Sequence, residues 1–208
     1  AFIGNVAIRV RDLEVRPVDP TAVCGWADAL YATLPPLEYR PDPARWAYLP
    51  RTRRRLERGG AFRVVMLGDS IVNDTNNSNF DALLMRLYPQ VDVQVICSVR
   101  GSTGCWFYQD DAAHRSYVVD LKPELLVIGG ISHKNDTAAI RTVIRKTRAQ
   151  CDCDILLLSG PVGPDWRPFD AARPEQPLGA MKYGGDAFNL ELAELATSEQ
   201  VEFLDMNT

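Results

Sequence analysis

Histidine is scarce in this chain, and its cysteines do not follow a metal-binding pattern. The 208 residues include two histidines and five cysteines, and no two cysteines form a C-x-x-C pair. Structural zinc sites usually combine such pairs with further cysteine or histidine ligands. We therefore expect no metal site, and free thiols instead. Cys151 and Cys153 stand two apart and are expected to point to opposite faces, so a disulfide between them is not expected.

An excess of positive charge and long apolar runs are also lacking. The chain has 23 lysines and arginines against 27 aspartates and glutamates, which gives a formal charge of -4. Sequence-independent nucleic-acid binding needs a basic field, so no nucleic-acid partner is expected. No apolar run approaches the roughly 20 residues that a membrane-spanning helix needs. The one basic cluster, within residues 51–58, is interpreted as the solvated face of a short helix, with a phosphate-binding patch as the alternative.

The order of the predicted elements indicates an α/β domain. Short apolar runs alternate with helical patterns along the second part of the chain. This alternation predicts a mostly parallel sheet covered by helices on both faces, and so a three-layer α/β fold whose ligands bind beyond the carboxyl ends of the strands. The predicted strands are 62–67, 91–98, 125–128, 154–158 and 201–204, and the predicted helices are 79–88, 110–119, 136–150 and 187–198.

The first 60 residues do not follow this alternation. Residues 2–16 alternate apolar and polar side chains, which indicates one or two strands. They are either the end of a preceding β-sandwich domain or an edge strand added to the main sheet. A proline-rich linker follows, with short helices predicted at 22–34 and 45–58. The chain is thus divided into a β segment, a linker and a main domain, at residues 1–20, 21–60 and 61–208.

A serine follows the first strand of the main domain, after a tight turn. Gly68 and Asp69 form the turn, and Ser70 comes next, where it should be exposed in the crevice at the strand ends. If a helix follows, its N-terminal N–H groups would favour a developing oxyanion. The alternative is an ordinary helix N-cap serine. The stretch lacks the second glycine of the G-x-S-x-G elbow, and it is not the phosphate loop of nucleotide-binding proteins.

This Gly68–Asp69–Ser70 stretch resembles the first motif of the SGNH (GDSL-like) hydrolases. Members of that family have a flavodoxin-like α/β fold and cleave acyl esters, including acetyl groups on carbohydrates, without a metal. The resemblance implies that Ser70 is the nucleophile, and that no cofactor is needed. It also implies that Gly101, after the second strand, donates its backbone N–H to the oxyanion, although Gly101 and Gly104 could simply form a loop. The resemblance covers residues 60–208 and depends on motif order and spacing.

The loop after the third strand departs from the G-x-N-D pattern of the family. Aligned on its glycine, the loop has Ser132 in place of the asparagine and His133 in place of the aspartate. A longer loop would instead make Asn135 and Asp136 the remnant of the pattern. A serine hydroxyl can donate one hydrogen bond to an oxyanion, although it is less preorganised than an amide. Asp136 is alternatively the N-cap of the next helix.

The D-x-x-H motif, which supplies the general base in this family from a loop after the last strand, is not found at that place in the chain. A serine nucleophile needs such a base. One possible source is a histidine that follows residue 208, since the last predicted strand is expected to precede the motif. His133 is the other candidate, because it follows a strand in the same crevice, with a positioning or substrate-contacting role as its alternative. His114 is expected at the surface.

The sequence therefore predicts an ester hydrolase that removes acyl groups, acetyl in particular, from a glycan or a small-molecule ester. Its alternative is a glycan-binding or scaffold module on the same fold that has lost activity, which the altered third motif favours. Four aromatic side chains are expected either to line the cleft or to pack in the core: Trp106, Phe107, Tyr108 and Trp166. A location outside the cytoplasm, periplasmic or secreted, is expected, and the oligomeric state is not predicted.

Overall fold

Five parallel strands form the centre of the molecule. The computed structural model describes residues 21, 24–25, 28–29, 32–33, 45–160, 162–164, 180–182 and 185–206. The strands lie in the order β2-β1-β3-β4-β7, the arrangement of flavodoxin-like sheets, so the predicted α/β class is confirmed. Their bounds are β1 Gly60–Gly68, β2 Val91–Val99, β3 Leu125–Ile128, β4 Asp154–Leu158 and β7 Glu202–Leu204.

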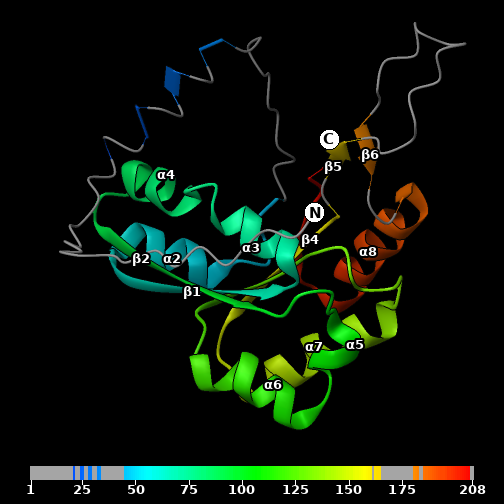
Figure 1. Cartoon of the computed structure of the whole chain (residues 1–208). Coiled ribbons are helices and arrows are strands. Elements are labelled where there is room, and N and C mark those ends of the chain that lie inside the picture. The colour runs from blue at the N-terminus through cyan, green and yellow to red at the C-terminus, as the bar shows by residue number, and fades with distance from the viewer. Residues whose placement is uncertain are drawn as a thin grey trace, which may run out of the picture.

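Helices cover both faces of this sheet and make it the middle of three layers (Figure 1). Successive residues of β1 point to opposite faces, so Val65 and Leu67 join one core whereas Val64 and Met66 join the other. Burying each such side chain contributes about 1.5–3 kcal/mol. One layer contains α2 Pro50–Arg58, α3 Ser70–Asn76 and α4 Phe80–Leu87, and the other contains α5 Cys105–Tyr108, α6 Asp111–Tyr117, α7 Thr137–Gln150 and α8 Gly185–Glu199.

The strand order creates a switch point between β1 and β3. After β1 the chain passes to β2 on one side, and after β2 it crosses to β3 on the other side of β1. Loops that leave β1 and β3 therefore diverge to opposite faces, and the carboxyl ends of these two strands border a crevice. Gly68 is the last residue of β1, and the Ser70 turn follows it. The fold brings this turn to the edge of the sheet where ligands bind.

Several short elements were not predicted. Helix α3 has the sequence SIVNDTN, in which β-branched and asparagine residues lower the helix propensity. Helix α5 has only four residues. A two-stranded antiparallel sheet joins β5 Val162–Pro164 to β6 Ala180–Lys182, and a single 3-10 turn, η1, spans Val119–Leu121. Short elements such as these depend on their surroundings more than on local sequence.

The region before the sheet is described in part. The predicted helix 45–58 begins later, at Pro50, because proline favours the first helical position, and a turn occupies residues 45–48. Within the predicted helix 22–34, the described residues 24–25 and 28–29 are helical. The predicted strands in residues 1–20 lie outside the described residues. No helix in the described part of the chain is long and apolar enough to cross a bilayer.

The basic cluster lies on the exposed face of α2. Arg53, Arg54 and Arg58 are exposed to solvent. Arg51 forms an ion pair with Asp152, and the Arg55 guanidinium lies 2.5 Å from a carboxylate oxygen of Glu124. This arrangement agrees with the interpretation of the cluster as a solvated helix face.

The cysteines are free thiols, as expected. Cys24 and Cys105 are buried, and the other three are partly exposed. The prediction that Cys151 and Cys153 point to opposite faces is wrong, since both pack against the core under α7 and α8. Residues two apart in a strand share a face, as Val65 and Leu67 do in β1, so the expectation misapplied strand geometry, and Cys151 in any case ends helix α7.

The prediction that His114 lies at the surface is also wrong. Its side chain is 1% exposed and packs between α6 and α7. The ring Nε2 lies 3.0 Å from the Thr147 hydroxyl, and Nδ1 has no partner among the described residues. Burial lowers the pKa of His114, as does the nearby Lys146 ammonium, whereas Asp111 acts in the opposite direction. The fold therefore favours the neutral form of this histidine.

Because His114 is buried, we expect the fold to lose stability as the pH falls below neutrality. In the unfolded chain a histidine titrates near pH 6.5, and in the fold its lowered pKa resists protonation. The unfolded state therefore takes up more protons below about pH 6.5, and the free energy of unfolding should fall, by up to about 1.4 kcal/mol per pH unit for one histidine. Urea unfolding between pH 7.5 and pH 5 measures this slope. His114→Asn should reduce the slope, and an equal slope in both proteins would contradict the prediction.

Candidate active site

Ser70 is exposed at the first position of α3, directly after the turn that ends β1. The residue that caps this helix is Asp69, whose carboxylate Oδ1 accepts a hydrogen bond of 3.0 Å from the Ile71 N–H. The alternative that Ser70 is the N-cap is therefore wrong. Because Asp69 caps the helix, the Ser70 hydroxyl is not required for this purpose, and it stands at the switch point of the sheet.

The Asp69 carboxylate also joins the β1 turn to the loop after β3. Its Oδ2 accepts hydrogen bonds from the N–H groups of Ile131, at 2.8 Å, and Ser132, at 2.7 Å. With Ile71 this makes three backbone donors to a side chain that is 1% exposed. Gly130 lets the loop pass this close, since it has a φ of +104° and a Cβ there would lie 2.7 Å from Oδ1. A buried carboxylate thus fixes two loops relative to each other.

The loop after β2 lies beside the same turn. The Arg100 N–H donates to the Gly68 carbonyl at 3.1 Å, and Gly101 follows as an exposed residue of a turn. The Thr103 hydroxyl donates to the Gly101 carbonyl at 3.0 Å, and Ser102 has a left-handed φ of 53°. These bonds hold the backbone of Gly101 at the carboxyl edge of the sheet, next to the strand that carries Ser70.

The two candidates for the third oxyanion donor, Ser132 and Asn135, lie at different places in the loop after β3. Ser132 is half-buried and is bonded directly to Asp69 through its N–H. Asn135 is three residues farther on, exposed, and in the left-handed region with a φ of 55°. Asp136 caps helix α7 by accepting a hydrogen bond of 2.9 Å from the Ala139 N–H, as its alternative interpretation predicted. The structure therefore brings Ser132, but not Asn135, into contact with the Ser70 turn.

His133 is buried between the β3 loop and helix α5, with 3% of its side chain exposed. Its Nε2 lies 3.0 Å from the Gly129 carbonyl, and its Nδ1 lies 3.4 Å from the Cys105 backbone nitrogen. These partners assign the proton to Nε2, which donates, and leave Nδ1 as an acceptor. Burial lowers the pKa of His133. Both ring nitrogens already have partners, so neither is directed to the Ser70 hydroxyl in this structure.

Helix α5 packs closely against the β3 loop through its aromatic side chains. Tyr108 is fully buried and donates its hydroxyl proton to the Gly68 carbonyl at 2.7 Å. Trp106 is half-buried, and its indole N–H donates to the Ser132 carbonyl at 2.9 Å. Phe107 is half-buried and packs edge-on against Trp106 and Tyr108. Tyr108 is thus a packing residue, Trp106 and Phe107 reach the surface, and Trp166 lies outside the described residues.

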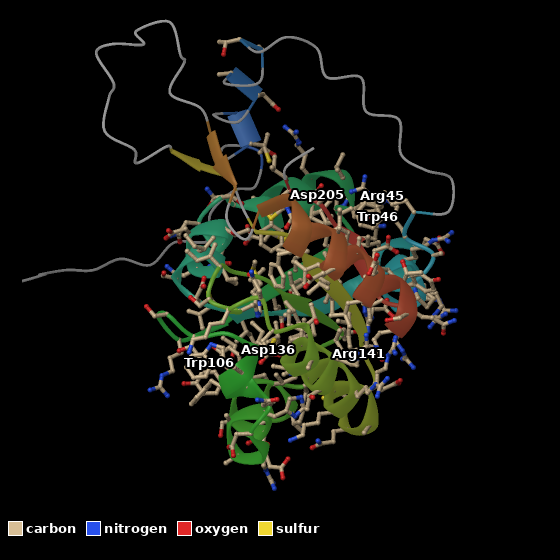
Figure 2. The ribbon with its side chains drawn as sticks, turned by 90° about the vertical axis from the view of Figure 1, so that its right-hand side faces the viewer. Arg45, Trp46, Trp106, Asp136, Arg141 and Asp205 are labelled. Carbon is tan, nitrogen blue, oxygen red and sulfur yellow. The ribbon has the colours of Figure 1, made fainter. Side chains whose placement is uncertain are left out.

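The ends of β4 and β7 carry a hydrogen-bonded pair that sequence reasoning did not single out. The Ser159 hydroxyl donates to the Asp205 carboxylate at 3.0 Å and accepts from the Met206 N–H at 2.7 Å. Because β7 is parallel to β4, the chain leaves β7 at the same edge as Ser70. Figure 2 labels Asp205 at this strand end. Within the described ranges, no group of three histidine, cysteine or acidic side chains could hold a metal.

Removing the Asp69 carboxylate should destabilise the fold more than removing an ordinary cap. Asp69→Ala leaves three backbone donors without their charged acceptor, and a loss of at least about 3 kcal/mol is expected. Asp110→Ala is the matched control, because Asp110 caps α6 through two N–H groups at an exposed site and should cost about 1 kcal/mol. Urea unfolding measures both. Equal losses would contradict the joining role of Asp69.

Comparison with known proteins gives structural likenesses but no sequence relatives. No family model and no curated protein matches the chain. A catalytic mutant of an acetylxylan esterase from Geobacillus stearothermophilus is 14% identical, with a TM-score of 0.52 over 71% of this chain and 77% of that chain. A two-domain esterase active on acetylated mannans is 16% identical, with a TM-score of 0.53 over 75% of this chain and 41% of that chain.

A gut microbial diltiazem-metabolizing enzyme is a further structural neighbour. It is 13% identical, with a TM-score of 0.52 over 72% of this chain and 37% of that chain. This chain therefore spans less than half of the two-domain esterase and of the diltiazem-metabolizing enzyme. At sequence identities this low, the structural likeness establishes a common architecture alone. The chain shares the α/β fold of these enzymes.

Proposed function

We propose that this chain is a serine ester hydrolase of the SGNH type, with Ser70 as its nucleophile. One observation carries the proposal: Ser70 is exposed at the switch point of the sheet, while Asp69 caps the helix in its place. Ligands of such sheets bind at this position. The resemblance of the Gly68–Asp69–Ser70 stretch to the first SGNH motif gives the serine its role.

The proposed reaction proceeds through an acyl-enzyme. Ser70 Oγ attacks the ester carbonyl and forms a tetrahedral intermediate, which expels the alcohol and leaves the acyl group on the serine. Water then hydrolyses this ester and restores the hydroxyl. The N–H groups of Ser70 and Gly101 and the Ser132 hydroxyl are proposed to donate to the oxyanion. Contact between the Ser132 N–H and Asp69 supports the choice of Ser132 over Asn135.

The proton acceptor is proposed to be a histidine that follows residue 208. Both histidines of the chain are buried, and His133 has partners at both ring nitrogens. Strand β7 leads the chain to the carboxyl edge of the sheet, which is the edge that carries Ser70. In this account, His133 positions the β3 loop and does not act as the base.

The proposed substrates are acetylated glycans or similar small esters. This choice is supported by the structural neighbours, which include an acetylxylan esterase and an esterase active on acetylated mannans. An enzyme for such polymers would meet its substrate outside the cytoplasm, in the periplasm or after secretion. The second candidate is a glycan-binding module that has lost activity, which the engaged nitrogens of His133 favour.

A fluorophosphonate probe that labels activated serines tests the nucleophile. Labelling is expected in the chain extended beyond residue 208, and at a rate several orders of magnitude lower in the 208-residue chain, because a missing base costs that much. Ser70→Ala should abolish labelling. Ser116→Ala is the control, because Ser116 is an exposed serine of helix α6 and should leave the rate unchanged. Labelling that persists in Ser70→Ala would contradict the assignment of Ser70 as the nucleophile. An extended chain that is not labelled would favour the glycan-binding module.

The third oxyanion donor is tested by two matched substitutions in the β3 loop. Removing an oxyanion donor typically lowers kcat by about 100- to 1,000-fold. Ser132→Ala should therefore reduce kcat for an activated acetyl ester by about this factor with little change in KM, whereas Asn135→Ala should change it by less than about threefold. Steady-state kinetics of the extended chain measures both. The reverse order would transfer the role to Asn135.

A further inference from the structure

Two exposed cations lie against aromatic rings next to the proposed site. The Arg100 guanidinium carbon is 4.5 Å from the centroid of the Phe107 ring, and the Lys134 ammonium is 4.0 Å from the centroid of the Trp106 ring. The two rings pack edge-on, with their centroids 6.4 Å apart. We call these four side chains the cation–aromatic rim. They come from the β2 loop, helix α5 and the β3 loop, which are separate segments of the chain.

Hydrogen bonds connect this rim to the Ser70 turn at both ends. On one side, the Arg100 N–H donates to the carbonyl of Gly68, two residues before Ser70. On the other side, the Trp106 indole donates to the Ser132 carbonyl, and the Ser132 N–H donates to Asp69. The rim therefore borders the carboxyl edge of the sheet, and Figure 2 labels Trp106 beside Asp136, the residue that caps α7.

The charges of the rim are not neutralised by the described residues. Neither Arg100 nor Lys134 lies within 4.0 Å of a described carboxylate, and both side chains are exposed. On α7, by contrast, Arg141 and Arg145 both pair with Glu199, and Lys146 pairs with Asp111. The cations of α7 stabilise the fold, whereas those of the rim remain available to a ligand.

The carboxylates near the rim, Asp69 and Asp136, accept hydrogen bonds from backbone N–H groups. Asp69 accepts three N–H groups and is buried, and Asp136 accepts the Ala139 N–H as the cap of α7. Among the ion pairs of the described residues, none joins either carboxylate to a rim cation. An aromatic face holds a cation in place without cancelling its charge, so an anion can bind it with less loss of side-chain entropy.

We propose that the cation–aromatic rim binds carboxylates of the substrate, and that the substrates are acetyl esters of acidic glycans containing uronic acids. This inference rests on the proposed function, because it assigns the substrate class of the Ser70 site. Two cations over different rings provide two separate binding points, which suit a glycan with carboxylates on more than one sugar unit better than a small monoanionic ester. The attraction between exposed charges is modest and is screened by salt.

The test compares two acetylated oligosaccharides of similar length, an oligogalacturonide and a neutral xylo-oligosaccharide, using the chain extended beyond residue 208. The acidic substrate should have the higher kcat/KM, by about 3- to 10-fold at low salt, with the preference reduced at 1 M salt. In the Arg100→Gln, Lys134→Gln double variant the ratio of the two kcat/KM values should fall toward one. The control is Arg53→Gln, Arg54→Gln, which removes two exposed arginines from α2.

A binding measurement separates this inference from the proposed function. Calorimetry with the Ser70→Ala variant and a non-acetylated oligogalacturonide requires no catalysis. Binding that weakens by about the same factor in the rim double variant, but not in the α2 control, would support the rim even if the chain hydrolyses no ester. Equal kcat/KM values for the two substrates, or, for an inactive chain, no binding of the oligogalacturonide, would overturn the inference. A change of the same size in the α2 control would also overturn it.

Discussion

The Asp69 carboxylate is the interaction on which the proposed site depends. Its three backbone hydrogen bonds fix the turn that carries Ser70 to the loop that carries Ser132, across the switch point of the sheet. Both strands end at this edge, and this buried side chain fixes the two loops relative to each other through direct hydrogen bonds. It also caps α3, which leaves the Ser70 hydroxyl for chemistry. One side chain thus links helix capping, loop position and the exposure of the serine.

The fold was largely predictable, because apolar runs and turn residues mark the elements. The predicted strand 125–128 is identical to β3, and 154–158 is identical to β4. Helices α3 and α5 were not predictable, since they are short and are stabilised by contacts with other segments. The burial of His114 was missed for a similar reason: its partner, Thr147, is 33 residues away in a helix that becomes its neighbour only in the folded chain.

The candidate site was predictable only in part. Strand ends indicated Ser70 and Gly101, because parallel strands end at the same edge of a sheet. The contacts of Asp69 depend on β1 lying next to β3, and the order of strands in a sheet does not follow from their order in the chain. His133 looked available as a base, but its two ring partners, Gly129 and Cys105, come from segments whose packing the sequence does not specify.

The central claim, that Ser70 forms the acyl-enzyme, is tested most directly by mapping the acetyl group. The chain extended beyond residue 208 is mixed with 4-nitrophenyl acetate and quenched in acid, and its peptides are analysed by mass spectrometry. The account predicts one acetylated peptide, containing Ser70, which forms within the first turnover and disappears as the ester is consumed. Acetylation at another residue, or an acetylated enzyme that forms equally fast in Ser70→Ala, would contradict it.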